Sequence, residues 1–347
     1  MTATVRSHGR RPSSWRHPSR RAAENFRKIL DKSAQMWYDF PCDFIERTII
    51  MKKTHLGAVY IIIAALLWGA FPMFNRILYA GGVTVMQSVA ARALVTGIVY
   101  AVWGIFAGVY KGLKWRDFAF LAVYGLASVM GTYIFYALAI RELSGAMASM
   151  LLYTAPTFVI LFNRIFYKDP ITPVKLTALI VSFLGCCLVV RIYDPASISL
   201  NVLGILYGLL SGISYSLLTV IGRKAYARGY SSMQNTFIPA IFVALAVSAI
   251  QPPWSLPLTD GKVILCFLAI GILGSVLPYF FYLKGLSTGI DGGAAILLAN
   301  LEPVTATVLG FAIFSDVLEW PQIVGIVVVL TASVLPSWEG KLSARRH

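Results

Sequence analysis

Long apolar runs dominate the chain from residue 56 onward. Uncharged stretches such as Leu56–Asn75 and Ser144–Asn163 are each 20 residues long, which is the length that a helix needs to cross a bilayer. They show no alternation with a period of two, so they favour membrane helices over the strands of a barrel. The pattern predicts an all-α integral membrane fold with ten transmembrane helices, at 56–80, 84–107, 117–140, 144–166, 171–193, 201–226, 231–251, 262–286, 291–314 and 319–337.

A motif occurs twice in this pattern, 147 residues apart. The stretch Leu152-Tyr-Thr-Ala-Pro156 is followed by Lys168-Asp169, and Ala299-Asn-Leu-Glu-Pro303 is followed by Ser315-Asp316. In both copies the aspartate lies 13 residues after the proline. The same offset relates further landmarks, namely Gly57 to Gly204, Trp68 to Tyr215, Arg76 to Arg223 and Gly145 to Gly292.

This duplication predicts two five-helix repeats. The first covers residues 56–193 and the second covers residues 201–337, with a basic, largely disordered tail at 1–55 and a short cytosolic tail at 338–347. Within the first tail, residues 22–37 carry an interrupted apolar stripe that is compatible with a helix lying on the membrane surface. The Met51-Lys-Lys-Thr sequence is an alternative natural start, which would place the tail outside the native protein.

Composition and charge agree with a membrane protein. The chain is 58% hydrophobic and 13% charged, and its mean hydropathy is +0.72. The net charge of +15 comes from basic residues in the tails and short links, so the predicted partner is a lipid bilayer and not a nucleic acid. The four histidines lie outside the apolar segments and the four cysteines lack metal-type spacing, so neither a metal site nor a cofactor is predicted.

The distribution of Lys and Arg predicts the orientation. With the N-terminus in the cytosol, cytosolic links and the C-terminal tail hold thirteen of these residues and the outer links hold four. We therefore expect a multi-pass plasma-membrane protein with both termini in the cytoplasm. Because each repeat has five crossings, the second copy is expected to be inverted relative to the first.

Several of these motifs carry a family resemblance. The Leu-Leu-Trp-Gly-Ala run of the first helix, Tyr136-Ala-Leu, the Pro156 copy and Leu301-Glu-Pro-Val resemble the EamA-type repeats of the drug/metabolite transporter superfamily. The resemblance covers residues 56–335, although Lys168-Asp169 and Ser315-Asp316 stand where that family typically has Gly-Glu. It implies a ten-helix transporter of small polar metabolites that works by alternating access, with a central substrate cavity.

Glu302 is the foremost candidate for function, because an acid near the middle of a membrane helix should face a cavity or a partner. Its counterpart in the first repeat is Ala155, so the fold does not need an acid at this position, which favours a functional role for Glu302. The alternative is a structural role, in which Glu302 only accepts hydrogen bonds from packed neighbours beside Pro303. Asn300 lies about 200° around the helix from Glu302, so we expect one of them to face the substrate and the other to organise the helix.

Aromatic and proline residues predict where the cavity lies. We expect it between the third, fourth, eighth and ninth helices, because these carry three helix kinks and most of the intramembrane tyrosines. The predicted kinks are at Pro156, Pro278 and Pro303. The predicted substrate-binding residues are Trp68, Tyr133, Tyr136, Tyr153, Tyr279, Tyr282, Asn300 and Glu302.

Charged residues within or near the helices leave alternatives open. Arg92 is a possible partner for Glu302 or for a substrate carboxylate, but a structural role is favoured. Arg76 and Arg223 fall near helix ends, where anchoring is favoured, and Asp169 and Asp316 are interpreted as helix caps in preference to gates.

The function classes can be ranked on these features. An enzyme is disfavoured, because the apolar region has neither histidine nor a carboxylate pair, and no Gly-Lys-Ser/Thr phosphate loop supplies an ATP motor. The favoured interpretation is a secondary transporter that exports small polar metabolites such as amino acids. A multidrug or cation efflux transporter is the alternative, and a membrane receptor or structural protein is less favoured. The sequence leaves the oligomeric state open.

Overall fold

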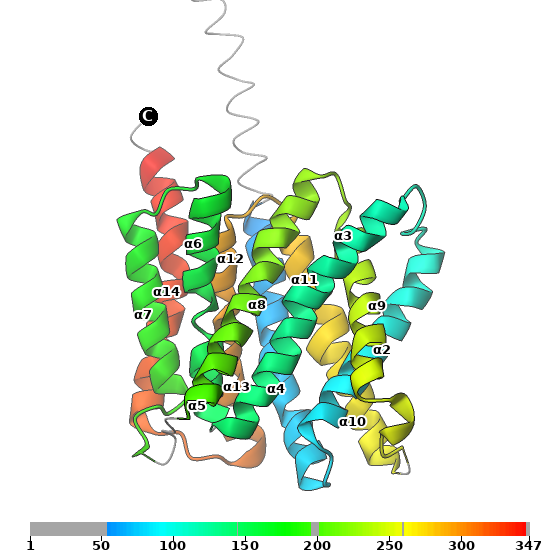
Figure 1. Ribbon diagram of the computed structural model, residues 1–347. Coiled ribbons are helices and arrows are strands. Elements are labelled where there is room, and N and C mark those ends of the chain that lie inside the picture. The colour runs from blue at the N-terminus through cyan, green and yellow to red at the C-terminus, as the bar shows by residue number, and fades with distance from the viewer. Residues whose placement is uncertain (1–53, 144, 196–200, 259, 345–347) are drawn as a thin grey trace, which may run out of the picture. The chain divides into compact units, whose positions relative to one another are not determined.

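The computed structural model describes residues 54–143, 145–195, 201–258 and 260–344, and the described part is helical without strands (Figure 1). Eight of its helical segments are long and apolar enough to cross a membrane, and two shorter apolar helices start at Pro173 and Trp320. These eight long and two shorter helices lie at the ten sequence positions where membrane crossings were expected. The tail at 1–53 and residues 345–347 lie outside the described residues, as does the expected surface helix at 22–37.

Helices of the first half follow the apolar runs. The first helix is Thr54–Ala80. The others are α2 (Val85–Phe106), α3 (Trp115–Gly125), the π-helical turn η1 (Leu126–Met130), α4 (Gly131–Glu142), α5 (Gly145–Leu152), α6 (Ala155–Tyr167) and α7 (Pro173–Val189).

Helices of the second half begin at related positions. They are α8 (Val202–Ala227), α9 (Ser232–Ile250), the short 3₁₀ turn η3 (Pro253–Ser255), α10 (Gly261–Gly271), the π-helical turn η4 (Ile272–Val276), α11 (Leu277–Leu286), α12 (Gly292–Ala299), α13 (Leu301–Phe314) and α14 (Trp320–Ala344). The first residues of α2, α5 and α7 lie 147 positions before those of α9, α12 and α14.

Local sequence explains where α2 and α9 begin. The hydroxyl of Thr84 accepts a hydrogen bond from the Gln87 backbone N–H, and the Gln87 side chain accepts one from the Thr84 N–H in return. Ser231 and Gln234 make the same reciprocal pair at the start of α9, 147 residues later. Each capping box satisfies two backbone donors that the first helical turn leaves without partners.

The fourth and ninth spans are interrupted close to their prolines. The helix expected at 144–166 is two segments, α5 and α6, and that expected at 291–314 is α12 followed by α13. Pro156 and Pro303 therefore lie in the first turn of a new helical segment, and Pro278 lies likewise at the start of α11. Proline is tolerated there because the first-turn N–H has no intrahelical acceptor, so the interruption precedes each proline.

Equivalent helices of the two halves pack against each other. The α2 helix packs along α9, and α7 packs along α14, while α4 lies against α8 (Figure 1). Gly97 in α2 makes room for Ala244 of α9, since a Cβ at Gly97 would overlap the Ala244 methyl group. Many large apolar side chains on the outside of the helices are exposed, as expected for a surface that meets lipid.

Candidate functional site

A cavity of about 390 Å³ lies between the helices. Such a volume is in the range of small-molecule sites in proteins. More than half of its lining comes from the first helix and α2, from which only Trp68 and Arg92 were among the candidates, and the remainder comes from α4, α5, α8, α11 and α13. The expected location was therefore incomplete, because the first two helices contribute side chains that the proline and tyrosine pattern does not reveal. The lining residues from these two helices are Trp68, Phe71, Pro72, Asn75, Arg76, Tyr79, Val85, Ser88, Val89 and Arg92.

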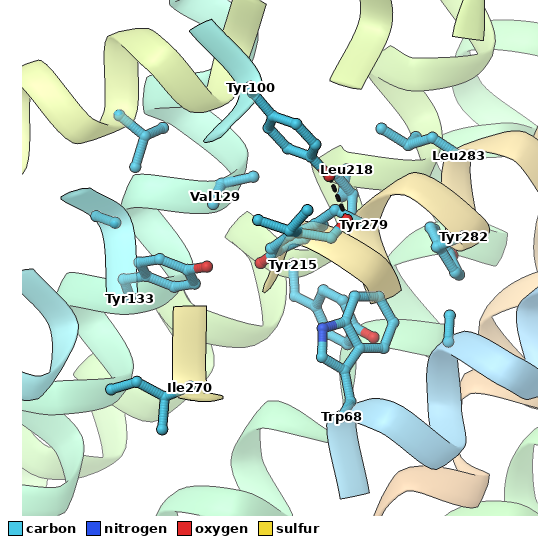
Figure 2. Packing of buried hydrophobic residues seen from close by; sticks show 14 of the residues in the cluster. Trp68, Tyr100, Val129, Tyr133, Tyr215, Leu218, Ile270, Tyr279, Tyr282 and Leu283 are labelled. Carbon is cyan, nitrogen blue, oxygen red and sulfur yellow. Dashed lines mark hydrogen bonds between the residues drawn. The ribbon is translucent and has the colours of Figure 1, made fainter. Parts of the chain in front are cut away.

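An aromatic wall forms one side of the cavity. The Trp68 indole lies 5.4 Å from the ring of Tyr279 and 6.0 Å from that of Tyr215, measured between ring centroids (Figure 2). Tyr282 lies behind this wall, 5.4 Å from Trp68, and its hydroxyl is hydrogen-bonded to Thr219 at 2.6 Å. These rings offer an apolar surface with a few hydroxyl groups, which suits a ligand with both apolar and polar parts.

Arg92 projects from the interior of α2 into the cavity. Its Nε donates a 2.5 Å hydrogen bond to Ser275 Oγ, and its Nη2 donates a 2.8 Å bond to the Gly274 carbonyl. The guanidinium carbon is 4.5 Å from the centre of the Phe71 ring and 4.4 Å from that of Tyr133. No described residue accepts a hydrogen bond from Nη1, so this nitrogen is available to a ligand.

The two groups that hold Arg92 belong to η4. Turns of this π-helical type occur frequently at functional sites. The hydroxyl of Ser275 also shares a 2.9 Å hydrogen bond with that of Tyr133, so arginine, serine and tyrosine form one connected group. This geometry fixes the guanidinium plane.

Glu302 is the acidic residue of the cavity wall, in the first turn of α13. The positive end of the helix dipole favours a carboxylate at this position. Within the described residues the carboxylate makes neither an ion pair nor a hydrogen bond, although Arg92 is near enough to interact with it electrostatically. A carboxylate held inside a membrane segment without a partner is available to bind a cationic group.

Asn300 faces away from the cavity. Its side-chain amide is buried and donates a 2.8 Å hydrogen bond to Ser182 of α7. Of the two polar residues around the interruption, Asn300 therefore ties α12 to a neighbouring helix while Glu302 lines the cavity.

The structure separates the residues proposed from sequence into two groups. Those that line the cavity together are Trp68, Tyr133, Tyr136, Tyr279, Glu302 and Arg92. Those that do not line it are Tyr153, Tyr282, Asn300, Pro156, Pro278 and Pro303. Tyr153, for example, packs in a separate apolar cluster with Cys186 and Val304.

Tyr215 is a cavity residue that the candidate set omitted. Its hydroxyl is buried and has no hydrogen-bond partner among the described residues, and Glu302 is close enough to interact with it electrostatically. The sequence does contain a signal for it, because Tyr215 is the counterpart of Trp68 at the 147-residue offset.

The interpretation of Asp169 and Asp316 as helix caps was wrong. Asp316 accepts hydrogen bonds of 2.8 and 3.0 Å from Arg76, and Asp169 forms an ion pair with Arg223. The cap of α7 is instead Thr172, whose hydroxyl accepts from the backbone of Lys175. Each aspartate thus pairs with an arginine of the other half, a long-range contact that a local capping pattern does not reveal.

Sequence comparison matches both halves of the chain to one family. The profile of the EamA-like transporter family matches residues 55–191 and again residues 202–338. An uncharacterized inner membrane transporter of Salmonella typhimurium is 22% identical over 306 residues, which cover 85% of this chain and 99% of that protein. An S-adenosylmethionine uptake transporter of Rickettsia felis is 25% identical over 201 residues, which cover 58% of this chain and 66% of that protein.

The fold also resembles that of a protein whose crystal structure has been solved. The TM-score is 0.69 with 17% sequence identity, and the match covers 84% of this chain and 98% of the solved one. At this identity the likeness shows a shared fold.

Proposed function

The chain belongs to the EamA-like transporter family, and from that premise we propose that it is a secondary transporter that exports small polar metabolites such as amino acids or related compounds. It is a multi-pass membrane transporter and not an enzyme. The observation that carries the proposed substrate class is the cavity itself, where Arg92 and Glu302 present opposite charges beside an aromatic wall. An amino acid offers a carboxylate to Arg92, an ammonium group to Glu302 and a side chain to the aromatic wall.

We propose that transport occurs by alternating access between two inverted five-helix repeats, 56–193 and 201–337. The directions of equivalent helix pairs support this, because α5 lies below α6 in Figure 1 whereas α12 lies above α13. An inverted pair of repeats supplies two related conformations, each open on one side of the membrane.

Transport assays in proteoliposomes test the substrate class. We expect saturable counterflow of labelled amino acids after reconstitution, at rates well above those of empty liposomes. S-adenosylmethionine belongs in the same panel, because it combines an amino-acid end with a positive charge and is named as cargo of a relative. Counterflow of none of these compounds would contradict the proposed substrate class.

Efflux of organic cations is the second candidate. One observation favours it, namely the Glu302 carboxylate that lies without a partner beside aromatic rings. Counterflow of a lipophilic cation that lacks a carboxylate, with no counterflow of amino acids, would favour this alternative over the first.

We also propose that the protein lies in the plasma membrane with both termini in the cytosol, on the thirteen-to-four bias of basic residues. A membrane-impermeant thiol reagent added outside cells is expected to modify cysteines placed at Gly82 or Asp260. It should spare cysteines at Gly112 or Gly229. The opposite labelling pattern would reverse the proposed orientation.

A further inference from the structure

The two ends of the central cavity are built from equivalent residues, and they differ in one respect. At one end, four residues of α8 are packed against neighbouring helices and do not line the cavity, and at the other end their counterparts 147 positions earlier do line it. The α8 residues are Leu218, Thr219, Gly222 and Tyr226, and the counterparts in the first helix are Phe71, Pro72, Asn75 and Tyr79.

Contacts of α8 close the first end. The Tyr226 hydroxyl donates a hydrogen bond to the Leu283 carbonyl of α11. Nearby, Tyr124 donates a 2.9 Å bond to the Leu218 carbonyl. The Asn235 amide donates a 3.2 Å bond to the Gly222 carbonyl, a contact that has an equivalent at the other end, where Ser88 donates a 2.6 Å bond to Asn75. The α8 helix is therefore held against helices on three sides, and the cavity lined by Tyr124, Leu218 and Asn235 measures only about 20 Å³.

The hydrogen bond equivalent to that of Tyr226 is not formed at the other end. The counterpart of Tyr226 is Tyr79, that of Leu283 is Tyr136, and both of these residues line the cavity. Tyr79 is 39% exposed, and among the described residues its hydroxyl interacts with Ser88 of α2 and makes no hydrogen bond to the Tyr136 carbonyl. A helical carbonyl has a second lone pair, as Leu283 shows by accepting from both Tyr226 and the Ser287 N–H, so the Tyr136 carbonyl has the capacity to accept a tyrosine hydroxyl.

Ion pairs between the two halves are instead the same at both ends. Arg223 pairs with Asp169 and lies 4.3 Å over the Tyr167 ring, while Arg76 pairs with Asp316 and lies 4.4 Å over the Phe314 ring. Each residue lies 147 positions from its equivalent, namely Arg223 from Arg76, Asp169 from Asp316 and Tyr167 from Phe314. Because these contacts exist both where the cavity is closed and where it is open, their formation does not depend on which end is open.

From this asymmetry we propose that Tyr226 and Tyr79 are the alternating gate residues of the transporter, and that the two arginine–aspartate pairs are constant hinges. When the cavity opens at the α8 end, Tyr226 leaves the Leu283 carbonyl and Tyr79 donates to the Tyr136 carbonyl. The substrate cavity then changes sides while the ion pairs stay formed. This inference rests on the alternating access proposed above.

Cysteine labelling tests the gates without measuring transport. Val89 lines the open end, and its counterpart Thr236 is buried at the closed end, so cysteines at these two positions report on each end. In liposomes, with the native cysteines replaced by alanine, N-ethylmaleimide should modify Val89→Cys rapidly and Thr236→Cys slowly. Tyr226→Phe should speed labelling of Thr236→Cys by about 2- to 10-fold, because one hydrogen bond is lost from only one conformation. Labelling of Val89→Cys should slow by a smaller factor, because the conformation that exposes Val89 is the more populated one. Tyr79→Phe should slow labelling of Thr236→Cys and leave the already rapid labelling of Val89→Cys the same or slightly faster.

Tyr207→Phe is the matched control, since Tyr207 also lies in α8 but stacks on Phe135 away from the gate. Replacing Arg223 and Asp169 together by glutamine and asparagine should not move the two labelling rates in opposite directions. The gate assignment is overturned if Tyr226→Phe and Tyr79→Phe behave like Tyr207→Phe, or if both reporters change in parallel in a protein that remains monodisperse. The protein could also show opposite shifts of the two labelling rates and yet transport none of the tested compounds. That result would support the gate assignment and contradict the proposed substrate class.

Discussion

Replacing Glu302 with glutamine is expected to lower transport of zwitterionic or cationic substrates by about 10- to 100-fold, because a hydrogen bond to a charged group contributes about 1.5–3 kcal/mol. The carboxylate lines the cavity and has no partner among the described residues, so the substitution removes a charge that only the substrate would neutralise. Glutamine has nearly the same shape. The folded protein should therefore keep its melting temperature or gain slightly, since an uncompensated charge no longer lies within the membrane segment.

The measurement is the initial rate of counterflow in proteoliposomes, together with a thermal unfolding curve in detergent. Glu142→Gln is the matched control, because Glu142 pairs with Arg141 at the end of α4 and lies outside the cavity. Asn300→Ala should give the opposite profile, with a lower melting temperature from the lost bond to Ser182 and little change in substrate affinity. Normal transport by both Glu302→Gln and Asn300→Ala would mean that the ninth span is only scaffold.

The sequence predicts much of the fold because the two repeats confirm each other. A single offset of 147 residues relates the starts of α2 and α9, of α5 and α12, and of α7 and α14. Apolar runs of about 20 residues and reciprocal caps such as that of Thr84 and Gln87 are local signals, and local signals are readable in one chain. Membership of the transporter family agrees with the resemblance inferred from the motifs.

The site was harder to predict because it depends on which face each helix turns inward. Tyr136 and Tyr153 are both intramembrane tyrosines, yet one lines the cavity and the other packs against Cys186 and Val304. Composition does not distinguish them, since Tyr136 lies within α4 whereas Tyr153 lies at the interruption between α5 and α6. The partners of Asp169 and Asp316 lie more than 50 residues away in sequence, so only the folded arrangement brings each to its arginine.

A comparison of two substrates gives the second large prediction, which concerns Arg92. Replacing Arg92 with lysine should raise the KM for an amino acid by about 10-fold or more, while the KM for the corresponding amide should change little. Lysine keeps the positive charge but lacks the planar fork, so it loses the stacking between Phe71 and Tyr133 and the simultaneous bonds to Ser275 and Gly274.

The free Nη1 is the reason to expect an effect that depends on the substrate. If that nitrogen binds a carboxylate, the amino acid loses a charge-assisted hydrogen bond in the variant, whereas the amide had only a neutral one to lose. Arg141→Lys is the matched control, because Arg141 is exposed at the end of α4 and pairs with Glu142. Counterflow of the two substrates at varied concentration gives both KM values in each variant. An equal rise for the amino acid and its amide would show that Arg92 braces α2 against η4 and does not contact the substrate carboxylate.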